Sequence, residues 1–356
     1  MVSSKDSRYF RKAVIFKLLL TLDMIYSHSE NLAVYTLDAA NGFLSAVAVF
    51  LNKIQLTSAG LVNAGFLFIA GYSFFNGFTI EKLPKKWKNR FFTLFIPWLI
   101  WNTVMWLLFI IIQNIPVIAS KMNMATVYMP TFRSWFVDGL LRSADGPMWF
   151  MLNLIIVVAL SPVIYCFIKN RYTGLIFIAG LITGRYFLQY DFNSWYASVI
   201  YFSEAGYIAL HLKSFWLREF KKSEKYIAAA LVAAFYILFY GIPCIAGELM
   251  HVLVLTAVIP AIWVLMPDRE LKPKEKSFNT YRFWIYASHY LLLEAVEKLW
   301  LIFAGDTPVA AIVDYLFAPI ITMAILIAAG SIIRKYLPAV WAVLNGYIPP
   351  YNISKR

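Results

Sequence analysis

The sequence has little charge and little cysteine for its length. Only 14% of its 356 residues are charged, whereas a soluble domain averages about 25%. The two cysteines, Cys166 and Cys244, are far apart in apolar surroundings, so they support neither a disulfide framework nor a metal site. No convincing cleavage site follows the first apolar run, which argues against a cleaved signal peptide. A soluble enzyme and a disulfide-rich secreted domain are both excluded.

Apolar residues dominate instead. Hydrophobic side chains make up 61% of the chain, and they occur in runs of around twenty residues. A membrane β-barrel would show ten-residue segments of alternating polarity, which the sequence lacks. The composition therefore predicts an all-α polytopic membrane protein embedded in a lipid bilayer.

The net charge of +13 does not indicate a nucleic-acid partner, because the basic residues are unevenly distributed. They gather at every second boundary between apolar runs, as the positive-inside rule predicts for cytoplasmic loops. The basic groups lie at 5–17, 82–90, 169–171, 213–225, 269–282 and 334–356.

The run lengths and charges fit about ten transmembrane helices with both termini cytoplasmic. The expected spans are 13–35, 57–78, 91–113, 147–168, 172–190, 195–212, 226–243, 249–266, 283–303 and 310–333. We expect a cytoplasmic segment over 1–12, one membrane-embedded domain over 13–335 and a cytoplasmic tail over 336–356. The apolar segment 39–51 is too short to cross and is interpreted as interfacial or re-entrant. The long external connection 114–146 is interpreted either as a lid or acceptor-recognition element or as a plain interfacial helix.

The first apolar run carries ionisable residues, which are costly inside a span and are functional candidates by default. Lys17 and His28 stand eleven positions apart, so on one helix they lie within about 20° of the same face and roughly 16 Å apart along the axis. Thr21 and Met24 fall on that face too. The helical repeat thus predicts a stripe of side chains along one helix face, with the Lys17 cation at one end and the His28 imidazole at the other.

Five short motifs, taken in order, resemble the acyltransferase-3 family of membrane O-acyltransferases. Lys17-x10-His28 is similar to the family's Arg-x10-His signature, with Lys in place of Arg and without its planar fork. The other four are Phe66-Leu-Phe-Ile-Ala-Gly71-Tyr72 (with Ala70 where the family has a small hydroxyl residue), Lys86-Trp-Lys-Asn-Arg90-Phe-Phe-Thr-Leu-Phe-Ile-Pro97-Trp98, Pro147-Met-Trp149-Phe150-Met-Leu152 and Ile285-Tyr286-Ala-Ser-His289-Tyr290.

This resemblance implies a membrane acyltransferase domain in the cytoplasmic membrane of a bacterium. It implies transfer of an acyl group, usually acetyl from acetyl-CoA, onto a hydroxyl of an envelope glycan or glycolipid. An imidazole is a natural base for a weakly nucleophilic sugar hydroxyl, so we expect His28 to be the general base or relay. Lys17 is expected to meet the donor from the cytoplasmic side.

Other residues are candidates for binding, each with a structural alternative. Arg90, Lys86 and Lys88 are candidates for the CoA phosphates, although the positive-inside rule also explains them. Arg185 and Glu204 occupy adjacent antiparallel spans, so they form either a structural ion pair or part of an acceptor site.

Trp149 is expected to wall the cavity, and His289 is either catalytic or structural. Glu248 and His251 have a spacing seen in metal pairs, but no third ligand is near, so no metal is expected.

A transporter or flippase for a lipid-linked sugar or small solute is the alternative, because intramembrane charges suit it equally well. Transporters often show inverted repeats with broken helices, and the sequence has no obvious internal repeat. A sensor without chemistry has no specific feature in its favour.

Overall fold

The computed structural model describes residues 4–29, 31–32, 42–116, 126–188, 195–241, 248–305 and 307–347. Within these ranges every regular element is a helix, which confirms the predicted all-α class. The elements are α1 (Ser4–Ser27), α2 (Phe43–Phe75), η2 (Ile80–Lys82), α3 (Leu83–Arg90), η3 (Phe91–Phe95), α4 (Ile96–Gln113), α6 (Phe132–Ser134), η4 (Trp135–Leu141), α7 (Met148–Ala159), α8 (Ser161–Ile168), α9 (Arg171–Leu188), α10 (Trp195–His211), α11 (Lys213–Trp216), α12 (Lys222–Gly241), α13 (Glu248–Leu265), α14 (Pro273–Ala304), α15 (Pro308–Tyr336) and α16 (Pro338–Leu344).

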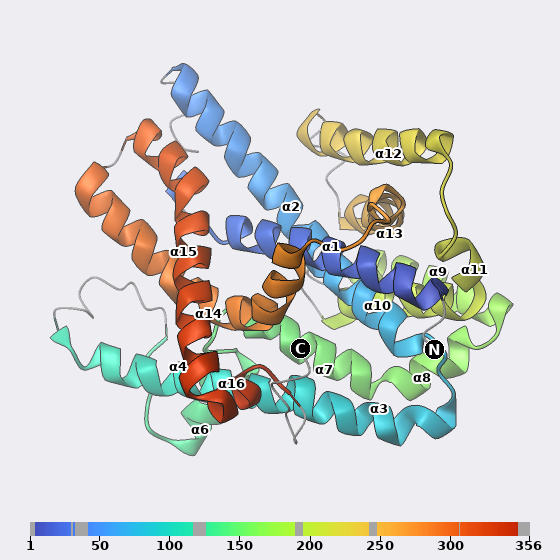
Figure 1. Ribbon diagram of the computed structural model, residues 1–356, viewed down its shortest axis with the longest axis horizontal. Helices are drawn as coiled ribbons and strands as arrows, with labels where there is room; N and C mark the ends of the chain where they lie inside the picture. Colours follow the sequence, from blue (N-terminus) through green and yellow to red (C-terminus); the bar gives the residue numbers. More distant parts are fainter. Residues whose placement is uncertain are drawn as a thin grey trace.

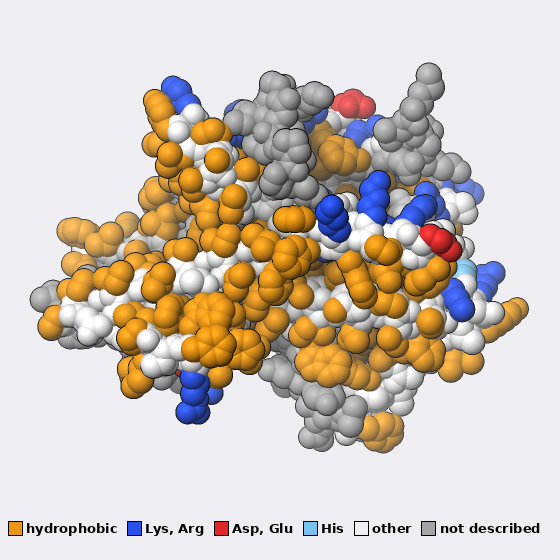
Figure 2. Space-filling view, turned by 90° about the horizontal axis from the view of Figure 1, so that it is seen from below, with side chains coloured by type: hydrophobic (Ala, Val, Ile, Leu, Met, Phe, Trp, Pro, Cys, Tyr) orange, Lys and Arg blue, Asp and Glu red, His pale blue; other side chains and the backbone are white. Residues whose placement is uncertain are grey.

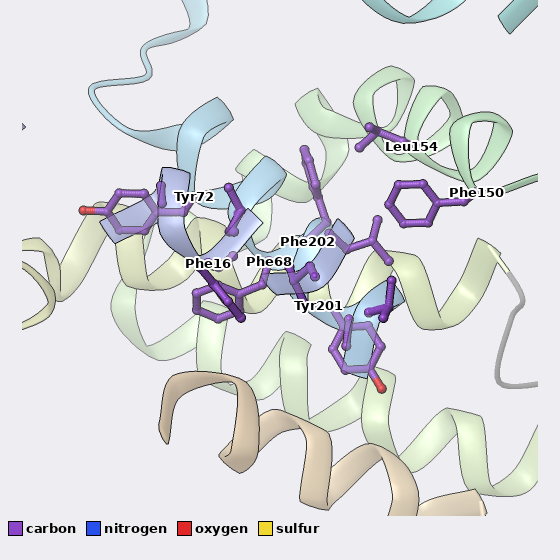
Figure 3. Close-up of a cluster of buried hydrophobic side chains, with 14 of the residues drawn as sticks. Phe16, Phe68, Tyr72, Phe150, Leu154, Tyr201 and Phe202 are labelled. Carbon is purple, nitrogen blue, oxygen red and sulfur yellow. The ribbon is translucent and has the colours of Figure 1, made fainter. Parts of the chain in front are cut away.

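Helices α2 and α10 pack against each other at the centre, and α1 crosses between α2 and α14 (Figure 1). The other close pairs are α14 with α15 and α12 with α13. Glycine permits the central contact. A Cβ at Gly71 would lie 2.5 Å from the backbone oxygen of Phe202, so only glycine lets the two backbones approach this closely. The buried aromatic cluster around this crossing includes Phe68, Tyr72 and Phe202 (Figure 3).

The structure supports a polytopic membrane protein but does not establish the number of spans. Three helical stretches are long and apolar enough to cross a membrane: Phe43–Phe75, Ile80–Gln113 and Pro308–Tyr336. The α7–α8 pair makes a fourth if its two helices are one span. Hydrophobic side chains cover most of the face in Figure 2, and lysine and arginine side chains gather mainly toward one end. The total of about ten stays a prediction.

The interpretation of 39–51 as a separate interfacial or re-entrant segment is wrong for its described part, because α2 runs unbroken from Phe43 to Phe75. Residues 39–41 lie outside the described residues. Asn52 and Gln55, which follow that segment, are buried within α2. Gln55 is only 5% exposed, and its side-chain amide donates to the backbone oxygens of Ser27 and Ser29. The Gln55 side chain thus ties α2 to the end of α1.

The first predicted span is also shorter than expected, since α1 ends at Ser27 rather than near residue 35. His28 lies in a turn directly beyond it, where its backbone N–H donates to Ile25 O at 3.2 Å. The Ser27 hydroxyl donates to Met24 O at 2.8 Å and the Gln55 amide donates to Ser27 O at 3.2 Å. These bonds satisfy carbonyl groups that a helix end leaves open. His28 is therefore held at a helix terminus.

The expected span 147–168 is bent by 57° between α7 and α8. Pro162 lies in the first turn of α8, where its ring cannot continue the preceding helix. The Val158 carbonyl near the break accepts from Trp87 Nε1 at 3.0 Å and from the Ser161 hydroxyl at 2.6 Å. The bend is thus a built feature of the fold with its carbonyl group satisfied.

The same local motif precedes α12 and α14. Arg218 binds Glu224 through both terminal nitrogens and donates to the following carbonyl at 3.1 Å, while Lys221 N donates to Glu224 Oε2 at 2.7 Å. Arg269 and Glu275 repeat these contacts, with Lys272 N to Glu275 Oε2 also at 2.7 Å. The chain thus uses the same Arg–Glu cap at the start of α12 and at the start of α14.

These caps predict a loss of stability in acid. The Arg269 guanidinium and the Lys272 N–H lower the pKa of Glu275 to about 2, and the equivalent groups do the same for Glu224. Because the folded pKa lies below the ordinary carboxyl value, the stabilisation is complete above that value and is lost as the pH falls toward 2. We expect the thermal unfolding temperature to drop between about pH 5 and about pH 2, and to drop less in the Glu224→Gln, Glu275→Gln double variant. Equal acid sensitivity in both proteins would contradict this assignment.

Candidate active site

An inner cavity of about 260 Å³ lies between α1, α2, α7 and α14. Lys17 and Thr21 enter it from α1, and Thr21 is held by a hydrogen bond from its hydroxyl to Lys17 O at 2.7 Å. Apolar groups form most of the remaining wall, including Phe150 on α7 (Figure 3). The cavity is therefore a mostly apolar space with a few placed polar groups, as ligand pockets usually are.

Three cations converge on this cavity. Lys17 on α1, Arg90 at the end of α3 and Arg282 on α14 all line it, and Lys17 is within electrostatic range of the other two. Among the described residues that line the cavity, none is acidic. Among the described residues, Arg282 Nη1 donates to Asn279 Oδ1 at 2.5 Å. Like charges brought together in an apolar space repel each other, so the arrangement favours a bound anion.

A smaller outer chamber adjoins the inner cavity. His28 and Trp149 line it together with Met24, and Phe66, Phe150 and Tyr286 line both spaces. Lys17 and Thr21 thus face one cavity while Met24 and His28 face the next, along successive turns of the same helix and its terminal turn. The two spaces lie end to end along the stripe from the cation to the imidazole.

His28 packs between two aromatic rings of α14. Its ring centroid lies 5.1 Å from that of His289 and 5.5 Å from that of Tyr290, which meets it edge-on. Tyr286 closes the chamber and donates its hydroxyl proton to Pro147 O at 2.6 Å. Two histidines from distant motifs therefore meet at the outer chamber.

Two of the three residues predicted to bind CoA phosphates lie away from the cavity. Lys86 donates from Nζ to Phe74 O, and its ammonium lies 5.2 Å from the centre of the Phe74 ring. Lys88 is exposed on α3. Neither lines the inner cavity, whereas Arg90 does.

Arg185 and Glu204 also lie outside the walls of both spaces. They are buried on the packed pair α9 and α10, where Arg185 is 0% and Glu204 8% exposed. Tyr201, one turn before Glu204, interacts electrostatically with both. The helices that carry the two residues pack against each other, and a role of Arg185 and Glu204 in acceptor binding stays a prediction.

Arg282 is a charged residue of the cavity wall that the sequence analysis did not select as a candidate. It belongs to the basic group 269–282, which the positive-inside rule already explains. A signal was nevertheless present, because Arg282, Tyr286 and His289 are spaced four and three residues apart and so share one helix face. That face carries the cation toward the inner cavity and the imidazole toward the outer chamber.

Comparison with known proteins adds a family and a relative. The family described as an acyltransferase domain matches residues 15–333. The chain is 23% identical over 366 residues to the succinoglycan biosynthesis protein ExoH of Rhizobium meliloti (strain 1021), across 96% of this chain and 93% of that protein. No solved structure matches.

Proposed function

Because the chain belongs to the acyltransferase-3 family and is therefore an acyltransferase, we propose that it moves an acyl group from acyl-CoA to a hydroxyl of an envelope polysaccharide or glycolipid. Acetyl-CoA is the donor we expect first. The family match decides between the enzyme and the transporter that the intramembrane charges left open.

The observation that carries the proposal is the pairing of a tricationic cavity with an imidazole-lined chamber. Coenzyme A has a polyanionic end, which carries its phosphates, and an apolar pantetheine arm that ends in the thioester. Lys17, Arg90 and Arg282 suit the phosphates, since guanidinium and ammonium groups are the usual phosphate partners in proteins. On an ideal helix Lys17 and His28 would be roughly 16 Å apart, a length that an extended pantetheine arm spans.

The chemistry follows from this orientation. His28 accepts the proton of the acceptor hydroxyl as the oxygen attacks the thioester carbonyl carbon. The tetrahedral intermediate then collapses, the C–S bond breaks, and the departing thiolate takes the proton back from the His28 imidazolium. The products are the acylated hydroxyl and free coenzyme A, and His28 is regenerated. The shared apolar wall of Phe66, Phe150 and Tyr286 limits the access of water to the thioester.

The acceptor class rests on the relative. ExoH takes part in the biosynthesis of succinoglycan, a polysaccharide, which supports a glycan acceptor for this chain. A bacterial relative likewise supports placement in the cytoplasmic membrane, with the cations of the inner cavity toward the cytoplasm.

The test is donor turnover by the purified protein in detergent or nanodiscs. We expect saturable release of free coenzyme A from acetyl-CoA, measured with a thiol reagent, and faster release when a lipid or glycan extract supplies hydroxyl acceptors. Binding that weakens with added salt is also expected, because the donor phosphates are held by charge. A well-folded protein that neither binds nor consumes acetyl-CoA or succinyl-CoA would overturn the proposal.

A further inference from the structure

The hydrogen bonds of His289 determine which of its ring nitrogens carries the proton. Its Nδ1 lies 2.8 Å from Tyr286 O and 3.2 Å from Ile285 O, both backbone carbonyls of its own helix. A carbonyl oxygen only accepts, so Nδ1 must carry the hydrogen. A neutral imidazole has one donor and one acceptor nitrogen, and Nε2 is therefore an acceptor with an available lone pair.

That lone pair is buried without a donor. His289 is 0% exposed, and among the described residues its Nε2 has no hydrogen-bond partner. Buried acceptors in proteins nearly always find a donor, so an orphaned one calls for an explanation. The neighbouring ring that carries an N–H is His28, whose centroid lies 5.1 Å away.

We propose that His289 is a positioning residue, whose Nε2 accepts a hydrogen bond from His28 and so sets the tautomer of the base; this inference rests on the proposed function. The ring centroids are 5.1 Å apart, and rotation of the His28 ring about its broad χ2 torsion would turn an N–H group toward His289 Nε2. One nitrogen of His28 is then committed to His289, and the other presents its lone pair to the acceptor hydroxyl in the outer chamber.

The hydrogen bond between His28 and His289 also stabilises His28 when it is protonated during the reaction. When His28 takes the hydroxyl proton, both of its nitrogens carry hydrogen, and the N–H facing His289 keeps its acceptor. His289 neither gains nor loses a proton in the cycle. It acts through orientation and through stabilisation of the imidazolium, as the third member of a hydrolase triad does for its histidine.

Two conservative substitutions at 289 separate this role from simple packing. The amide oxygen of His289→Gln reaches the position of Nε2, so it preserves the acceptor for His28. The shorter side chain of His289→Asn reaches only the position of Nδ1 and removes that acceptor. We expect His289→Asn to lower kcat at least tenfold with KM for acetyl-CoA within about twofold of wild type, and His289→Gln to retain most of kcat. Equal losses in both variants would overturn the proposal.

Two further measurements test the proposal even if a single variant at 289 misfolds. With His28→Ala already present, adding His289→Asn should cause no further loss of turnover, because the residue acts only through His28; a further tenfold loss would contradict the proposal. In wild-type protein labelled with ring-¹⁵N histidine, the NMR shifts of His289 should be those of an imidazole protonated at Nδ1, and protonation at Nε2 would refute it. A wild-type protein that lacks all donor turnover while His289 is protonated at Nδ1 would count against the proposed function alone.

Discussion

Replacing His28 with alanine is expected to lower the turnover of acetyl-CoA by about 10²–10⁴-fold, the usual contribution of a positioned general base. Both the sequence spacing and the structure select this residue, since it is the imidazole that lines the outer chamber. Its removal leaves the tricationic cavity intact, so donor binding should stay close to that of wild type. A large fall in kcat with little change in donor affinity is the expected pattern.

His211 provides the matched control. It lies at the end of α10, where a ring nitrogen lies 2.8 Å from Ile168 O, and its ring packs on Tyr207 with centroids 4.8 Å apart. His211 lines neither cavity, so His211→Ala is expected to affect stability more than chemistry. If His28→Ala retains full turnover at normal expression, His28 is not the base.

Replacing Arg282 with glutamine should raise KM for acetyl-CoA by about 10- to 100-fold, since hydrogen bonds to charged groups are worth about 1.5–3 kcal/mol. Arg282 lies beside Lys17 and Arg90 in the cavity wall, so its loss removes one of the three charges proposed to bind the donor phosphates. Arg282→Lys should be intermediate, because it keeps the charge but loses the planar fork. The measurement is the donor dependence of the initial rate at fixed low salt.

Lys88→Gln is the control for Arg282→Gln. It removes one positive charge from α3, two residues before Arg90, at an exposed position outside the cavity. We expect KM to change by less than about twofold, since exposed charges are well screened. If Lys88→Gln raises KM as much as Arg282→Gln, the phosphates are held at the surface rather than in the cavity.

Much of the site follows from the sequence because helical periodicity is a local property. The eleven-residue spacing of Lys17 and His28 leads to adjoining cavities along one helix, and Trp149 lies in the wall where its motif suggested. The family was identified from short motifs, and the match over residues 15–333 confirms it.

What the sequence did not reveal depends on contacts between distant segments. Arg282 is one basic residue among several, and only the packing of α14 against α1 turns it toward Lys17. The continuity of α2 through Gln55 is supported by carbonyl groups at the end of α1, which accept hydrogen bonds from its side-chain amide. Lys86 is a residue type that often binds phosphate, yet its ammonium donates a hydrogen bond to the Phe74 carbonyl. Partners of this kind are invisible to local patterns.

The three cations of the inner cavity have a consequence for the membrane itself. If the proposed thioester donor enters from the cytoplasm and reaches the chamber of His28, the same route could admit protons and sodium ions. Lys17, Arg90 and Arg282 hold positive charge across that route, and fixed positive charge in a narrow passage excludes cations electrostatically. We therefore expect the three groups proposed to bind a polyanionic donor also to hinder the passage of cations through this cavity.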